Sequence, residues 1–232
     1  MNHKNITFIG TSHISRQSMD EVRNHIETYK PDIVGIELDR KRMQVLMQKG
    51  PRKISLRAIG KVGLKGFLFS VLGAWAEKKL GDLVGVAPGS EMKTAIKLSM
   101  KHNLKIAMID QDIEITLKRL SSELTWREKM NFVIDLVKAP FSREKIEFDL
   151  SKVPSSQLIK KMMLRLKVRY PNLYKVLVQE RNVVIARNLN AITKENPDKK
   201  ILAVMGAGHV EDVITLMKKM DNSVSYSYSV KG

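Results

Sequence analysis

The sequence contains no cysteine, which excludes disulfide bonds, thiolate metal sites and a cysteine nucleophile. Any metal ion held by side chains must therefore be bound by histidine, aspartate or glutamate. Aromatic residues make up only 6% of the chain, so few side chains are available to stack on nucleic-acid bases. Because no groove-reading motif is present either, the sequence argues against nucleic acid as a partner.

Long apolar runs are also absent. The longest uncharged apolar stretch, residues 66–76, is well below the ~20 residues that a helix needs to cross a bilayer. The N-terminus lacks the basic region, apolar run and small-residue cleavage site of a secretory signal. We therefore expect a cytoplasmic protein that is at most peripheral to a membrane.

Positive charge is abundant, with a formal net charge of +17. Residues 41–80 hold ten Lys or Arg against one acid, and residues 152–175 hold seven against none. Such surfaces are most often simply solvated, but they also suit an anionic membrane surface or an acidic partner. The basic segment 50–90 carries eight of the thirteen glycines, and we expect it to be the most mobile or most partner-dependent part of the chain. The sequence leaves a homodimer open.

Hydrophobic patterning predicts an α/β fold with a mostly parallel central sheet flanked by helices. We expect strands at 6–10, 33–36, 105–109 and 201–205, and an edge strand at 223–230. The predicted helices include one capped by Ser18 and one from Val210 to Met220. Residues 122–195 should form a helical insertion, with a capping box at Thr125-x-x-Glu128 and a long helix opened by Pro171. We interpret residues 1–232 as a single domain.

Polar residues follow each predicted strand. The first strand ends in Gly10-Thr11-Ser12-His13, the second in Glu37-Leu38-Asp39, the third in Asp110 and the fourth in Gly206-Ala207-Gly208-His209. Ligands bind outside the carboxyl ends of parallel strands, so two imidazoles and two or more carboxylates should meet at one edge. Two imidazoles and a carboxylate can hold a divalent ion and leave positions for water and substrate, which favours hydrolysis. We expect Asp110 to join as a further metal ligand if its strand is adjacent. Alternatively, each histidine merely ends a strand and hydrogen-bonds to a neighbour.

Other charged residues are second-rank candidates. Glu91 follows Ser90 in a helical first turn, where the helix dipole alone favours a carboxylate, and it is a further candidate metal ligand. Glu180 places a charge on an otherwise apolar helical stripe, where it either forms a structural ion pair or takes part in substrate binding. Arg181, or Arg40 and Arg42 after the second strand, could neutralise Glu180 or bind a substrate carboxylate.

Five ordered motifs give the sequence a family resemblance over nearly its whole length. It resembles the TraB family, which includes the pheromone-shutdown proteins and is similar to the GumN and Tiki proteins. The motifs are Gly10-Thr-Ser-His-Ile-Ser15, Pro31-Asp-Ile-Val-Gly-Ile-Glu-Leu-Asp-Arg40, Pro88-Gly-Ser-Glu-Met92, Ile109-Asp-Gln-Asp-Ile113 with Thr116-Leu-Lys-Arg119, and Gly206-Ala-Gly-His-Val210.

The resemblance implies a fold shared with erythromycin-esterase and haem-binding ChaN-like proteins. For the Tiki branch it implies a divalent-metal-dependent peptidase that needs both Gly-x-x-His motifs and an acid. His13 and His209 match the two motif histidines, and Glu37 matches the acid, so the expected cofactor is Mn²⁺, Co²⁺ or Zn²⁺. The TraB branch is associated chiefly with blocking peptide pheromone signals. A module that sequesters a peptide or a haem-like ligand without turnover is therefore the competing hypothesis.

Overall fold

The computed structural model describes residues 1–12, 15–48, 87–138 and 155–222. Within these ranges it contains a five-stranded sheet in the order β1-β2-β5-β3-β4, in which every neighbouring pair is parallel except β1 with β2. The predicted α/β class is confirmed. The strands are β1 (Asn2–His3), β2 (Ile6–Thr11), β3 (Ile33–Ile36), β4 (Lys105–Met108) and β5 (Ile201–Gly206).

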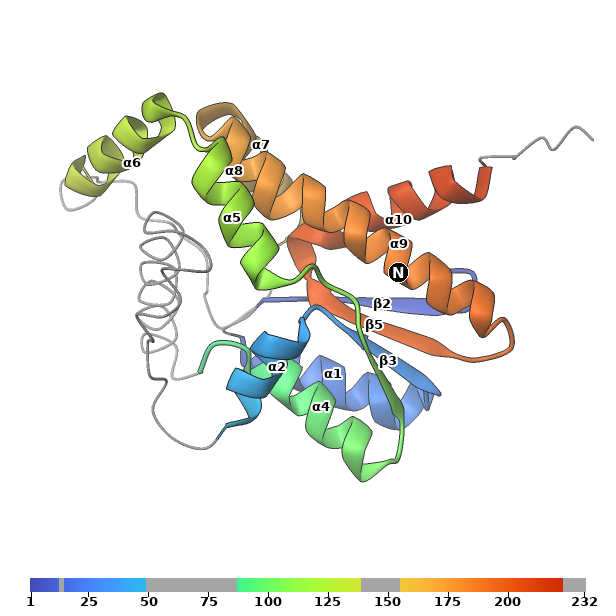
Figure 1. The fold of residues 1–232 in the computed structure, drawn as a ribbon. Coiled ribbons are helices and arrows are strands. Elements are labelled where there is room, and N and C mark those ends of the chain that lie inside the picture. Colours follow the sequence, from blue (N-terminus) through green and yellow to red (C-terminus); the bar gives the residue numbers. More distant parts are fainter. Residues whose placement is uncertain (13–14, 49–86, 139–154, 223–232) are drawn as a thin grey trace, which may run out of the picture.

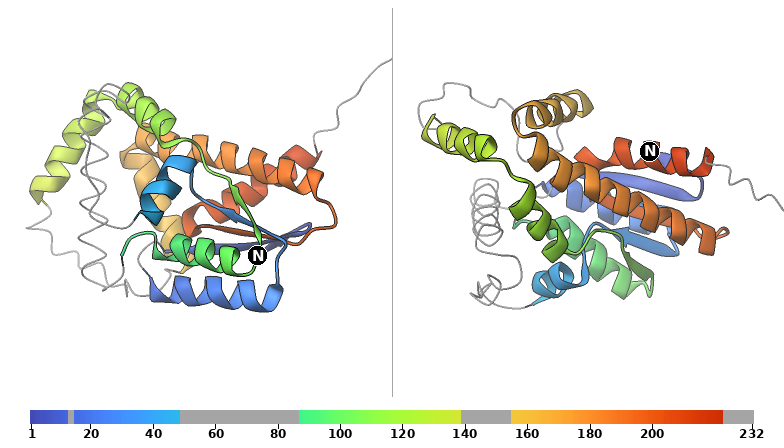
Figure 2. Two further views of the ribbon diagram at one scale, coloured as in Figure 1. Left: turned by 60° about the horizontal axis from the view of Figure 1, so that its bottom comes forward. Right: turned by 45° about the horizontal axis from the view of Figure 1, so that its top comes forward.

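Two pairs of helices cover the two faces of the sheet (Figures 1 and 2). Helices α1 (Arg16–Tyr29) and α4 (Ser90–Lys101) pack on one face, and α9 (Arg181–Glu195) and α10 (Ala207–Asn222) pack on the other. The central strand β5 is buried throughout, because alternate side chains enter the two cores. Leu202 and Val204 face α1 and α4, whereas Ala203 and Met205 face α9 and α10.

Both predicted helix starts at the ends of strands β2 and β5 are wrong by a few residues. Helix α1 is capped by Ser15, whose hydroxyl accepts from the Ser18 backbone N–H. The Ser18 hydroxyl instead accepts from the Ser12 N–H and so secures the exit of β2. Helix α10 begins at Ala207, not Val210, because β5 passes directly into it without an intervening turn. His209 therefore lies in a helical first turn.

Close packing at Gly10 fixes where α10 begins. A Cβ atom on Gly10 would lie 3.0 Å from the Ala207 Cα, a distance that a side chain cannot accept without a backbone shift. The absence of a side chain at Gly10 thus lets the start of α10, and with it His209, sit against the end of β2.

Apart from short links, the described part of the predicted insertion at 122–195 is helical. Its last helix, α9, packs directly on the sheet, since Ile185, Ala186 and Leu189 lie in the core between them. The other helices are α2 (Arg40–Met47), α5 (Ile113–Glu123), α6 (Trp126–Lys138), α7 (Ser156–Arg169), α8 (Pro171–Tyr174) and the π-helical turn η2 (Lys175–Glu180).

Residues 50–86 of the segment predicted to be mobile or partner-dependent lie outside the described residues, as does the strand predicted at 223–230. The prediction of a single domain stays a prediction. Among the described residues, no helix is both long enough and apolar enough to cross a membrane.

Glu128 ties two helix N-termini together and confirms the predicted capping box. Its buried carboxylate accepts hydrogen bonds from the Thr125 backbone and hydroxyl at the start of α6. It also accepts from the backbone N–H groups of Asn172 and Leu173 in α8 and from the Asn172 amide. Burial alone would raise the pKa of Glu128, but these donors more than offset that effect and hold the pKa below its ordinary value of 4.5.

Replacement of Glu128 should destabilise the protein in a pH-dependent way. Glu128→Gln is expected to lower the free energy of unfolding by about 2 kcal/mol at pH 7, because a charged acceptor with several donors is lost. A depressed pKa contributes stability that is complete above pH 4.5 and disappears as the pH falls through the lower folded-state value. The difference from wild type, measured by urea denaturation, should therefore narrow below pH 4.5. Exposed Glu27→Gln is the control, and a difference that stays constant between pH 7 and pH 3 would contradict the assignment.

Candidate functional site

The carboxyl ends of four neighbouring parallel strands meet at one edge of the sheet. Glu37 directly follows β3, Asp110 lies two residues beyond β4, and His209 lies in the first turn of the helix that follows β5. These strands are adjacent in the sheet, as the sequence analysis required for a shared site. His13, expected after β2, lies outside the described residues.

Glu37 joins three elements at this edge. It is 3% exposed. Its Oε2 atom accepts a hydrogen bond of 2.5 Å from the Gly206 backbone N–H, which joins β3 to the end of β5. Its Oε1 atom accepts from Arg181 and lies 3.4 Å from the His209 Nε2 atom. Glu37 and His209, separated by more than 170 positions in the chain, are thus in contact.

Arg181 supplies the positive charge that compensates the buried carboxylates. Its guanidinium bridges Glu37 and Asp110, with Nε 3.0 Å from Asp110 Oδ1 and Nη2 2.6 Å from Asp110 Oδ2. A further N–H donates to the Leu177 carbonyl at 3.2 Å. Burial disfavours the charged form of Arg181, but the two carboxylates outweigh it and raise its pKa above the ordinary value. Arg181 therefore stays charged at any physiological pH.

A second arginine extends the ion-pair network along the edge. Arg42 in α2 donates to Asp39 Oδ2 at 2.7 Å and also to Asp110. Asp39 in turn caps α2 through the Lys41 and Arg42 backbone N–H groups. Both oxygens of Asp110 consequently accept from guanidinium groups. Its predicted role as a metal ligand stays a prediction, while the observed contacts make it the anchor for the two arginines.

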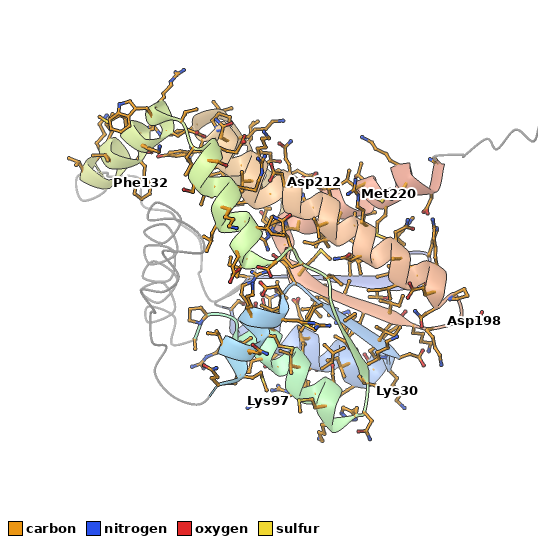
Figure 3. The ribbon with its side chains drawn as sticks, in the orientation of Figure 1. Lys30, Lys97, Phe132, Asp198, Asp212 and Met220 are labelled. Atoms are coloured by element: carbon orange, nitrogen blue, oxygen red, sulfur yellow. The ribbon has the colours of Figure 1, made fainter. Side chains whose placement is uncertain are left out.

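The orientation of His209 is set by a residue that the sequence analysis missed. Asn182 in α9 is 2% exposed, and its Oδ1 atom lies 2.6 Å from His209 Nδ1. The Asn182 Nδ2 group donates to Asp212 Oδ2 at 3.3 Å. Because a carboxylate can only accept, this contact directs the amide oxygen toward His209, so Nδ1 carries the proton. Asp212, labelled in Figure 3, lies one helical turn after His209 in α10.

This arrangement is suited to hold a cation between His209 and Glu37. With the proton on Nδ1, the Nε2 lone pair of a neutral His209 faces the Glu37 carboxylate. Two ligands that each lie ~2.0–2.1 Å from one tetrahedral ion are themselves ~3.3 Å apart, close to the 3.4 Å observed. A carbonyl-type acceptor on the second imidazole nitrogen is also the usual support of a metal-binding histidine.

The described residues supply only part of a ligand set. Among them, no three His, Asp or Glu side chains are placed to share one ion. His209 and Glu37 fit as two ligands, and the third position predicted from the sequence belongs to His13, outside the described ranges.

The remaining predicted residues lie in different surroundings. Glu91 is buried in the first turn of α4, and its role as a ligand stays a prediction. Glu180 pairs with Arg119 of α5, 2.6 Å away, and not with Arg181, Arg40 or Arg42 as suggested. The reason is that Glu180 and Arg181, being consecutive in one helix, point in different directions. Arg40 is exposed in the first turn of α2, where it lines a shallow cleft together with Asp110.

A separate cleft of about 330 Å³ opens beside Glu37 and Arg181. Its charged lining also includes Lys41 and Arg42, and Lys41 is held by Asp112 and Glu114. The apolar part of the lining comes from the link between β3 and α2, from α2 and α4, and from the start of α5. Its residues are Leu38, Val45, Leu46, Met92 and Ile113. The cleft thus offers apolar walls next to the carboxylate and guanidinium of the site.

Comparison with known proteins places these features in a family. The TraB/PrgY/gumN family model matches residues 1–225. An uncharacterized protein of Methanocaldococcus jannaschii is 37% identical over 227 residues, covering 96% of this chain and 55% of that protein. TraB domain-containing proteins of Homo sapiens and Bos taurus are 25% and 26% identical over 231 residues, covering 88% of this chain and 60% of theirs. The chain spans little more than half the length of these relatives. It belongs to the TraB/PrgY/gumN family.

Proposed function

We propose that this protein is a metal-dependent hydrolase of peptide substrates, with Mn²⁺, Co²⁺ or Zn²⁺ held by His209, Glu37 and His13. The observation that carries the proposal is the contact between His209 Nε2 and Glu37 Oε1. The other imidazole nitrogen, Nδ1, is oriented by the Asn182 amide oxygen. A histidine that only packed in a core, or only ended a strand, would not need a carboxylate beside Nε2 and an oriented amide on Nδ1 at the carboxyl edge of a sheet.

The chemistry divides between the cation and the side chains around it. When bound, a divalent ion polarises a substrate carbonyl and lowers the pKa of a water molecule. Glu37, fixed by the Gly206 N–H, would either bind the ion or act as a general base that accepts a proton from an attacking water. Arg181 is held rigidly by Asp110 and the Leu177 carbonyl. Its charge next to Glu37 would stabilise negative charge that develops on a substrate oxygen.

The cleft beside Glu37 supports a peptide as the substrate. Its volume of about 330 Å³ lies within the range of small-ligand sites, and its apolar walls suit side chains, with Arg42 and Arg181 available for carbonyl or carboxylate oxygens.

One observation favours the competing function, a module that binds a peptide or haem-like ligand without turnover. Arg181 already forms ion pairs with both Glu37 and Asp110, so these buried carboxylates have a cationic partner within the protein. A purified protein that captures ligand without retaining metal would support this second function.

Loss of His209 should abolish metal retention. We expect the His209→Ala variant to bind Mn²⁺, Co²⁺ or Zn²⁺ at least about 100-fold more weakly than wild type, because half of the described ligand pair is removed. Glu37→Gln should lose peptide hydrolysis while keeping part of the metal affinity if the carboxylate acts chiefly as a base. The measurements are elemental analysis, calorimetric titration and hydrolysis of a peptide library.

The matched control is His102→Ala, at an exposed histidine that ends α4. Equal metal retention by the His102→Ala and His209→Ala variants would remove His209 from the site. Hydrolysis that persists in metal-free protein would refute the proposed mechanism.

Asn182 should act on metal affinity through the imidazole of His209. Asn182→Ala is expected to weaken metal binding about 10–100-fold, the usual cost of losing a partner that orients a ligand. The double variant Asn182→Asp, Asp212→Asn should recover most of the affinity, because it keeps an acceptor for Nδ1–H and a donor behind it. The ¹⁵N chemical shifts of His209 in metal-free protein report the tautomer independently.

Asn188→Ala is the control for this test, since Asn188 lies on the same helix and donates to the Ile109 carbonyl at 2.9 Å. If Asn182→Ala and Asn188→Ala reduce metal affinity equally, or if the Asn182→Ala variant retains the Nδ1–H tautomer, Asn182 is not a positioning residue.

A further inference from the structure

Exposed apolar side chains are concentrated on α6 and α7. Helix α6 projects away from the sheet (Figure 1), and its exposed apolar residues follow a helical repeat that places them on one stripe. Trp126 is 75% exposed and Val137 is 62% exposed. The complete stripe consists of Trp126, Met130, Val133, Ile134 and Val137.

Helix α7 adds a second apolar strip beside basic residues. No residue of this helix is buried. Leu164 and Val168 are exposed one turn apart, and they line a groove of about 720 Å³ together with Arg127 and Arg165. On the α6 side this groove is lined by Arg127 and Asn131, which lie beside the stripe on the helix. We call the stripe on α6, together with Leu164 and Val168 of α7, the α6–α7 surface.

The two helices carry a net positive charge, although Lys160 of α7 pairs with Glu211 of α10. Helices α6 and α7 contain eight Lys or Arg and only two acids. One acid, Glu128, is buried as a helix cap, and the other, Asp135, pairs with Arg169. The cations are Arg127, Lys129, Lys138, Lys160, Lys161, Arg165, Lys167 and Arg169.

We propose that the α6–α7 surface docks on an anionic lipid bilayer. Apolar side chains with an exposed tryptophan, flanked by Lys and Arg, are the features of helices that lie in the membrane interface. The apolar stripe would enter the headgroup region while the cations approach acidic phosphates. Contacts of Asp135 with Arg169 and Tyr170 join α6 to the end of α7 and present the two helices as a unit.

Charge decides between the bilayer and other partners. A second copy of the chain would bring two basic surfaces together, which costs repulsion. A nucleic acid would gain from the cations but not from the aliphatic Val133, Ile134, Val137, Leu164 and Val168. A bilayer with anionic headgroups uses both properties of the surface at once.

Vesicle binding tests this proposal. The full chain should sediment with vesicles of phosphatidylcholine and phosphatidylglycerol, bind those of phosphatidylcholine alone about tenfold more weakly, and lose affinity as salt is raised. Val133→Ser with Val137→Ser, and separately Lys129→Gln with Lys161→Gln, should each reduce binding about tenfold. In a Trp75→Phe background, Trp126 is the sole tryptophan, and its emission should shift to the blue on binding.

The controls change equivalent residues elsewhere. Met100→Ser with Ile115→Ser alters exposed apolar residues of α4 and α5, and Lys93→Gln with Lys97→Gln alters cations of α4. Lys97 lies far from Phe132 of α6 (Figure 3). Equal losses in control and test variants, or unchanged Trp126 emission, would overturn the proposal. So would a dimer in sedimentation analysis that the Val133→Ser, Val137→Ser variant dissociates, since the surface would then join two copies.

Discussion

The carboxylate of Glu37 is the point on which the site depends. It is buried at the end of β3 and contacts the backbone of β5, the guanidinium of Arg181 in α9 and the imidazole of His209 in α10. A buried charge is tolerated only when it is paired and hydrogen-bonded. The strand order therefore matters for the chemistry. Because β5 lies beside β3, the Gly206 N–H, Arg181 and His209 all reach the Glu37 carboxylate.

A continuous helical run connects this site to the rest of the molecule. Helix α8, the π-helical turn η2 and α9 follow one another from Pro171 to Glu195. Glu128 caps the start of this run, next to α6, and Arg181 and Asn182 occupy the point where it reaches the sheet edge. Wide helical turns such as η2 recur at functional sites. Here the turn immediately precedes the two residues that position Glu37 and His209.

The sequence predicts much of this arrangement because its signals are local. Buried strands 6–10, 33–36 and 201–205 are short and mostly apolar. Glu37 comes directly after the second of them, and His209 comes three residues after Gly206, where β5 ends. Thr125-x-x-Glu128 specifies a capping box that the structure confirms. Asn182 escaped notice because an amide within a helix has no distinctive spacing; the adjacent Glu180-Arg181 pair was the only local signal. The Arg119 partner of Glu180 was missed because it joins helices 61 residues apart, where tertiary packing decides the contact.

Anomalous diffraction from crystals grown with Mn²⁺ tests the central claim most directly, because it locates the ion without reference to activity. The account predicts a single strong peak within ~2.3 Å of His209 Nε2 and of a Glu37 carboxylate oxygen, with Asn182 still in contact with Nδ1. A peak at another place, or crystals in which Arg181 bridges Glu37 and Asp110 and no ion lies beside His209, would contradict it.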